Sequence, residues 1–161
     1  MVIKAFLNTA DEKDTLTVVG GGPEEESLRK LASELDADGR IQFTGRIPRD
    51  EVLRKMGEAQ VFTLISHGET FGMVYIESML QGCLTIASKG GGFDGLIQDE
   101  VNGFICAPGD QKNLEEIYKK MAGMSADERN RIGQAAIDTA IHYSEQEVAE
   151  RYLQDILDNQ R

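Results

Sequence analysis

The chain has 161 residues, 40% of them hydrophobic, which is enough for one domain with a real core and too little for two domains of ordinary size. Asp and Glu number 28 against 17 Lys and Arg, and the net charge of −11 argues against nucleic acid or an anionic membrane surface as a partner. No apolar run approaches the roughly 20 residues that cross a bilayer, and the first residues lack the pattern of a secretory signal. We therefore expect a soluble, cytoplasmic protein.

The first part of the chain alternates between helical and strand-like patterns. Residues 1–9 have the apolar spacing of a helix but no start signal, so we expect the chain to be cut from a longer protein. The β-branched run 16–19 ends in a glycine-rich turn at 20–23, and helix-forming residues follow at 24–35. Glycines there permit close approach to a ligand, but a ligand-free turn is equally expected, because the full Gly-x-Gly-x-x-Gly fingerprint is absent.

The same alternation continues in the middle of the chain. Residues 41–45 predict a strand that ends in a glycine, and Pro48 opens a predicted helix that runs to about residue 59. The apolar run 61–65 then predicts a buried strand, and the polar break 66–69 predicts a loop. Strands that alternate with helices in this way indicate a parallel sheet.

A helix is predicted to begin after this loop, near Phe71 or Gly72. Its first N–H groups have no intrahelical acceptor and carry the positive end of the helix dipole, so they form a candidate anion site. Glu69 precedes the helix, and Glu77 lies on the order of 8 Å further along its axis. Because carboxylates repel phosphate, both are better suited to accept hydrogen bonds from hydroxyl groups, as in a sugar nucleotide. The alternative is that both are solvated glutamates on an amphipathic helix.

The last third of the chain is mainly helical. Residues 84–87 and 104–106 predict two more strands, and a glycine-rich turn at 89–93 precedes a short helical segment expected at 96–97. Three further helices are predicted at 110–121, 125–141 and 144–157, the last two starting with the capping boxes of Ser125 and Ser144.

The remaining reactive side chains indicate no other chemistry. Cys83 and Cys106 lie in apolar runs, so buried thiols are expected rather than a disulfide or a metal site. No Ser/His/Asp or Cys/His pattern suggests a hydrolase.

The stretch around the two glutamates resembles the signature of the group 1 retaining nucleotide-sugar glycosyltransferases, which have the GT-B architecture. In that family two glutamates form a Glu-x7-Glu motif in the second, donor-binding domain. The resemblance is carried by Glu69-x-Phe71-Gly72, Glu77, Gly82, Ser88 with the glycines 90 to 92, Leu16, Gly20-Gly21-Gly22-Pro23, Phe43-Thr44-Gly45, Asn102-Gly103-Phe104 and Tyr143-Ser144.

The resemblance implies both a fold and a reaction. The fold is a Rossmann-like parallel sheet with helices on both faces, one half of a GT-B enzyme, as a single domain over residues 1–161. The reaction is transfer of a hexose from a nucleoside diphosphate to a hydroxyl acceptor with retention, in polysaccharide or glycolipid synthesis, with no metal or other cofactor required. Glu69 is the implied catalytic residue, beside the donor sugar. The implied donor-binding residues are Gly20, Gly21, Gly22, Arg46, Ile47, Thr70, Phe71, Gly72, Met73 and Glu77, with the ribose on Glu77 and the base near Arg46. For Arg46 the alternative, a solvated cation in the loop, is equally expected.

The resemblance also implies missing parts. The family's donor domain starts with one more strand, central in the sheet between the strands at 16–19 and 61–65, and followed by an Arg and a Lys that neutralise the leaving diphosphate. Without it, two strand edges must pair with each other or with something else. We therefore expect a fragment whose partner is an N-terminal acceptor-binding domain of the same protein. A lipid-linked acceptor would place that protein peripherally at the inner face of a membrane. The chain also departs from the family pattern at one position: it has Gly95 where the family usually has a Glu after the glycine pair.

Two other functions remain open at this point. A nucleotide-sugar epimerase of related architecture would need further acid and base residues, and a flavodoxin-like nucleotide-binding module would have no catalysis at all.

Overall fold

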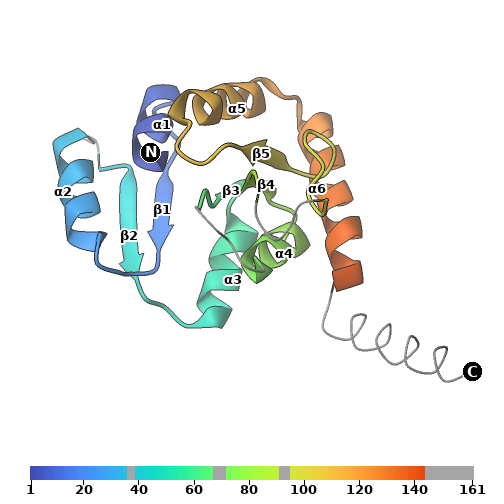
Figure 1. The fold of residues 1–161 in the computed structure, drawn as a ribbon, viewed down its shortest axis with the longest axis horizontal. Helices are drawn as coiled ribbons and strands as arrows, with labels where there is room; N and C mark the ends of the chain where they lie inside the picture. The colour runs from blue at the N-terminus through green and yellow to red at the C-terminus, as the bar shows by residue number, and fades with distance from the viewer. Residues whose placement is uncertain (36–38, 67–71, 91–94, 144–161) are drawn as a thin grey trace, which may run out of the picture.

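The computed structural model describes residues 1–35, 39–66, 72–90 and 95–143. Within these ranges helices alternate with parallel strands, which confirms the predicted α/β class (Figure 1). The elements in chain order are α1 (Val2–Thr9), β1 (Leu16–Val19), α2 (Glu25–Leu35), β2 (Ile41–Gly45), α3 (Arg49–Glu58), β3 (Val61–Thr63), α4 (Met73–Leu80), β4 (Leu84–Ser88), β5 (Phe104–Cys106), α5 (Gln111–Gly123), α6 (Ala126–Ala140) and the 3-10 turn η1 (Ile141–Tyr143).

The strands of the described residues form two parallel sheets. In the first, β1 pairs with β2 and Leu16 lies opposite Ile41. In the second, the order is β3, β4, β5, with Val61 opposite Leu84. Helices α2 and α4 provide the crossovers that parallel neighbours need. Within each sheet the carboxyl ends of the strands therefore lie at the same edge.

Strand β4 sends alternate side chains into two cores. Leu84 and Ile86 pack with residues of α1 and α5, whereas Ala87 packs with residues of α4 and with Ala136 and other residues of α6. This alternation follows from the two-residue period of a strand. Helices thus cover both faces of the second sheet, as expected.

The two sheets meet at unpaired edges. β1 is the strand of the first sheet that faces β3 in Figure 1, and no backbone pairing joins the two in the part of the chain that the structure describes. Helix α1 connects the sheets instead. Its Ala5 is fully buried in the core under β4, and its Phe6 ring lies 5.6 Å from the guanidinium carbon of Arg40, immediately before β2. The edges predicted to need a partner therefore do not pair with each other.

The prediction of a short helical segment at residues 96–97 is wrong. Leu96 and Ile97 are buried, but they lie in a turn held by the side chain of Asn102. Asn102 accepts a hydrogen bond from the N–H of Gln98 at 2.7 Å and donates to the carbonyl of Leu96 and to Oγ1 of Thr139, both at 3.0 Å. A buried amide side chain thus replaces the backbone bonds of a helix.

Other boundaries differ little from the predictions. β3 ends at Thr63, and the N–H of Ser66 donates at 2.6 Å to the side-chain hydroxyl of Ser88, the last residue of β4, rather than to a backbone carbonyl. The capping box at Ser125 is confirmed, whereas the helix predicted at 144–157 lies outside the described residues. None of the helices described here is long and apolar enough to cross a membrane.

Candidate functional site

Three segments that the sequence assigned to the site follow the carboxyl ends of strands. They are the turn 20–22 after β1, the loop 46–48 after β2, and the start of α4, which follows β3. Ligands of open α/β sheets bind at this edge. An ion pair between Arg49 and Glu77 joins the start of α3, just after the loop 46–48, to α4. The Arg46 side chain lies beside Gly21, where it would come into van der Waals contact with a Cβ at that position.

The glycine turn closes the first sheet at this edge. The N–H of Gly20 donates to the carbonyl of Gly45 at 2.8 Å, and the two residues have φ angles of 106° and 65°. These angles lie in the left-handed region that glycine adopts at no steric cost. A hollow of about 250 Å³ lies beside the turn, lined by the glycines 20 to 22 together with Leu28 and Phe43. The turn thus offers bare backbone next to open space.

Gly21 lies between two charged side chains. A Cβ on Gly21 would stand 2.6 Å from Oε2 of Glu25 and 3.8 Å from Cγ of Arg46. Glu25 is held by Arg29, whose Nε and Nη2 donate to Oε1 at 3.0 and 2.9 Å. The Arg29 guanidinium in turn lies 4.8 Å from the centre of the Phe43 ring. Arg46 is exposed, so it can contact a ligand at the turn.

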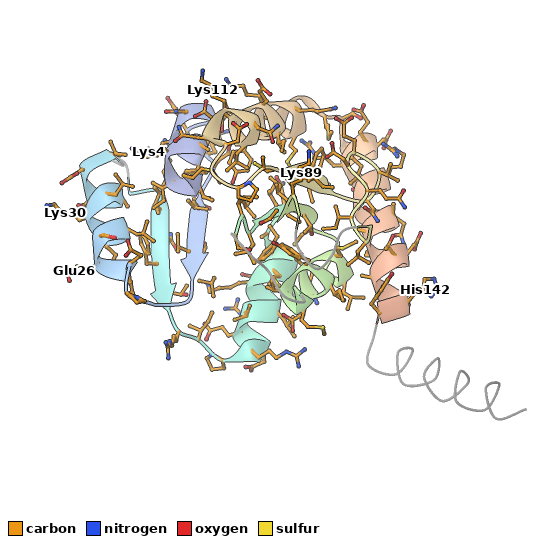
Figure 2. All side chains as sticks on the ribbon, viewed as in Figure 1. Lys4, Glu26, Lys30, Lys89, Lys112 and His142 are labelled. Carbon is orange, nitrogen blue, oxygen red and sulfur yellow. The ribbon has the colours of Figure 1, made fainter. Side chains whose placement is uncertain are left out.

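Two other charged side chains of helix α2 point away from the glycine turn and the sheet. Figure 2 shows Glu26 and Lys30 on the side of α2 that points away from the β1–β2 sheet. Both residues are exposed, so they have the character of solvated surface charges.

Helix α4 begins without a side-chain cap. Its N-cap is Gly72, which is buried, has φ 56° and ψ 37°, and provides no side-chain cap. The next residue, Met73, is 41% exposed. Tyr75 fixes the helix against the sheet, because its hydroxyl donates to the carbonyl of Leu64 at 2.9 Å. Because no side chain caps this helix start, the N–H groups of its first turn are suited to bind an anion.

Glu77 lies further along α4 in an ion pair with Arg49. The Nε and Nη2 atoms of Arg49 lie 2.9 and 2.7 Å from the same carboxylate oxygen, Oε1. The Glu77 side chain is only 18% exposed, compared with 68% for Arg49. Within the described residues no hydrogen bond to Oε2 is formed, so this oxygen is available to a ligand.

Sequence reasoning did not identify Arg49 as part of this site. A signal was present, because Arg49 is the first residue of α3, where the helix dipole disfavours a cation. Asp50 and Glu51 fill the rest of that first turn as the dipole favours. A cation in front of them is expected to need an acidic partner, which Glu77 supplies.

Comparison with known families decides where the chain belongs. Residues 1–139 match the family described as glycosyl transferases group 1. The chain belongs to the group 1 glycosyl transferases. It is 33% identical over 116 residues to an N-acetyl-alpha-D-glucosaminyl L-malate synthase of Bacillus anthracis, covering 71% of this chain and 30% of that protein. It is 32% identical over 147 residues to a sulfoquinovosyl transferase of Arabidopsis thaliana, covering 88% of this chain and 27% of that protein.

Solved structures share the fold of this group 1 glycosyl transferase. The Anabaena protein HepE in complex with UDP has a TM-score of 0.83 at 24% identity over 98% of this chain and 44% of its own. The C-terminal domain of a group 1 family protein from Francisella tularensis has a TM-score of 0.78 at 22% identity, over 91% of this chain and 78% of its own. These neighbours are GT-B glycosyltransferases. The chain thus spans less than a third of the two curated relatives and about half of HepE.

Only some of the predicted site residues of this group 1 glycosyl transferase lie within the described ranges. Among them, Arg46 is exposed and Ile47 half-buried in the loop after β2. Glu69, Thr70 and Phe71 lie outside the described residues, so their roles stay predictions.

The other reactive side chains that the structure describes do not form a second reactive centre. Burial raises the pKa of both the Cys83 and the Cys106 thiols to about 11, so neither is a ready nucleophile. Burial also raises the pKa of the Tyr118 phenol, which bonds Thr63 Oγ1 at 3.0 Å. In the described ranges, no three His, Cys, Asp or Glu side chains are grouped so that they could hold a metal ion.

A larger hollow, of about 380 Å³, lies away from the site. It is lined by Lys4, Leu7, Asn8, Leu35 and Gln111, none of which belongs to the predicted site. Figure 2 shows Lys4 near the amino-terminal ends of β1 and β2, opposite the glycine turn. Although it is larger, this hollow lies at the amino-terminal edge of the β1–β2 sheet, where α/β proteins do not usually bind ligands.

Proposed function

We propose that the chain is the donor-binding domain of a retaining glycosyltransferase. The enzyme transfers a hexose from a nucleoside diphosphate to a hydroxyl acceptor in polysaccharide or glycolipid synthesis. Family membership supports this, as do the UDP and UDP-glucose in the structures of the Anabaena protein and the sulfoquinovosyl transfer named for the Arabidopsis relative.

The observation that carries the proposal is the meeting of three segments at one edge. Glycine backbone, the N–H groups of a helix start that has no side-chain cap, and a carboxylate with one available oxygen lie there, with Arg46 beside Gly21 and Arg49 paired with Glu77. A nucleoside diphosphate has a matching set of groups, because its phosphates need N–H donors and its ribose hydroxyls need an acceptor.

Each segment has a role in this proposal. The base lies against Arg46 and Ile47, and the ribose hydroxyls bind Glu77. The diphosphate lies at the start of α4, where the N–H groups near Gly72 and Met73 stabilise the charge that develops on the leaving group.

The donor sugar lies next to Glu69, whose carboxylate holds its hydroxyls near the reacting carbon. Thr70 and Phe71 complete the turn around the diphosphate. The reaction needs no metal in this proposal, and the Arg and Lys that neutralise the leaving diphosphate come from the preceding part of the protein. Glu69 and Glu77 are not the acid and base of a glycosidase, since neither is assigned to activate water.

An acceptor-binding domain of the same protein precedes the chain in this proposal. The match of 91% of the chain to a structure named as a C-terminal domain supports this arrangement. The unpaired edges of β1 and β3 support it too, because a strand from the preceding segment would pair with both. The protein is cytoplasmic and meets a lipid-linked acceptor at the inner face of the membrane.

Calorimetric titration of the complete protein with UDP, GDP and ADP tests the proposal. We expect saturable binding of at least one diphosphate, tighter than that of its monophosphate, because the second phosphate adds contacts with the start of α4. Incubation with the matching sugar nucleotide and an acceptor should yield a glycoside rather than an epimerised sugar nucleotide. The isolated chain should show no transferase activity. Failure of a folded, complete protein to bind any nucleoside diphosphate or its sugar derivative contradicts the proposal.

A further inference from the structure

Arg49 contacts only one of the two carboxylate oxygens of Glu77. Both nitrogens of the Arg49 fork bond to Oε1 of Glu77, at 2.9 and 2.7 Å, and Oε2 keeps no protein partner within the described residues. A bidentate pair that served only to join two helices would ordinarily use both carboxylate oxygens. Here the arginine fixes the carboxylate through one oxygen and leaves the other for a ligand.

We propose that Arg49 is a positioning residue that orients Glu77 so that Oε2 accepts hydrogen bonds from the nucleotide ribose. This inference rests on the proposed function, in which Glu77 binds the ribose. A free glutamate side chain samples many rotamers and loses that freedom when it binds, whereas one already held by Arg49 loses less. The expected effect of Arg49 is therefore on affinity for the ribose.

The place of Arg49 in the chain supports this role. Arg49 directly follows the loop 46–48, which is proposed to contact the base, and it reaches across from α3 to α4. The pair thus links the segment at the base with the carboxylate at the ribose. Helix α3 itself gains nothing from a cation at its first position, because the helix dipole disfavours positive charge there.

The exposure of Arg49 makes the inference testable without loss of the fold. Its side chain is 68% exposed, and ion pairs that are this accessible to water contribute little to stability. Arg54 provides a matched control on the same helix. It is 56% exposed and pairs with Glu51 and Glu58, both within α3.

The experiment compares ribose recognition in the complete protein carrying R49Q, E77Q or R54Q. Calorimetry measures the affinity for the nucleoside diphosphate that the wild type binds and for its 2′,3′-dideoxy counterpart, and thermal unfolding confirms that each variant is folded. We expect the ribo-to-dideoxy affinity ratio to fall to near one in E77Q and to fall about fivefold in R49Q. It should stay at the wild-type value in R54Q, and the R49Q/E77Q double variant should match E77Q, because the two residues act through one contact.

The possible outcomes separate this inference from the proposed function. A wild type that does not prefer the ribonucleotide, or an E77Q that keeps the preference, overturns the ribose role of Glu77 and with it that part of the proposed function. If E77Q loses the preference while R49Q keeps the wild-type ratio, Glu77 binds ribose without Arg49 and the inference fails. A higher ratio in R49Q than in the wild type also overturns it, because Arg49 would then compete with the ribose.

Discussion

Replacement of Glu77 by alanine separates its proposed binding role from its structural one. The structural loss is the ion pair with Arg49, which contributes less than about 1 kcal/mol because Arg49 is 68% exposed. The binding loss is larger, since hydrogen bonds to a charged group contribute about 1.5 to 3 kcal/mol. We therefore expect donor KM in the complete enzyme to rise by about ten- to more than a hundredfold. Tm should fall by less than about 4 °C in a protein of at least this size.

Steady-state kinetics with varied donor concentration, together with thermal unfolding, measures both effects. Glu58→Ala is the control, because Glu58 is 60% exposed and pairs with Arg54 on the same helix, away from the proposed nucleotide. Removal of Glu58 should leave donor KM unchanged. A donor KM in Glu77→Ala no higher than in Glu58→Ala would refute the reasoning and leave Glu77 as a structural ion-pair partner.

Three further predictions concern other residues of the chain. Glu69→Gln in the complete enzyme should lower kcat at least about tenfold, roughly 1.4 kcal/mol, with a smaller change in donor KM, because the contacts proposed for Glu69 strengthen as charge leaves the sugar; a near wild-type kcat would count against this role. Asn102→Ala should lower the free energy of unfolding by about 3 kcal/mol, because each of its three hydrogen bonds contributes about 1 kcal/mol. Urea unfolding measures this loss, and a value below about 1 kcal/mol would show that the side chain does not hold the turn. Because burial raises the pKa of the Cys83 and Cys106 thiols from 9.0 to about 11, iodoacetamide at pH 9.0 should alkylate them more slowly in the folded than in the urea-unfolded protein. The raised pKa also stabilises the fold fully below pH 9.0 and progressively less as pH rises toward about 11, so an unfolding free energy that stayed constant over that interval would contradict the shift.

Local patterns in the sequence predicted most of the fold. The capping box of Ser125 and Glu128 placed the start of α6, because the motif satisfies backbone donors within one turn. The alternating side chains of β4 likewise follow from strand geometry, which depends only on neighbouring residues.

Contacts between distant residues could not be predicted in the same way. The turn at residues 96–97 is held by Asn102, which also donates to Thr139, 37 positions further along the chain. Arg49 and Glu77 are 28 positions apart, and no local periodicity links them. The segments that make up the proposed site could thus be named from the sequence, whereas the side-chain contacts between them depend on tertiary packing.

The separation of the two sheets was predictable only in part. The resemblance indicated two strand edges in need of a partner, and the structure leaves β1 and β3 unpaired within the described residues. The bridging role of α1, through Ala5 and Phe6, was not predicted. An amphipathic pattern shows that a helix is buried on one face but not which elements it packs against.

A crystal structure of the complete protein with its nucleoside diphosphate tests the central claim most directly. We predict that the nucleotide lies at the carboxyl edge of the strands, with its diphosphate on the N–H groups at the start of α4 and its ribose on Oε2 of Glu77. The same soak with Glu77→Ala should retain the position of the diphosphate and lose the ordered ribose contact. A nucleotide bound elsewhere, such as in the hollow beside Lys4 and Leu7, would contradict the account.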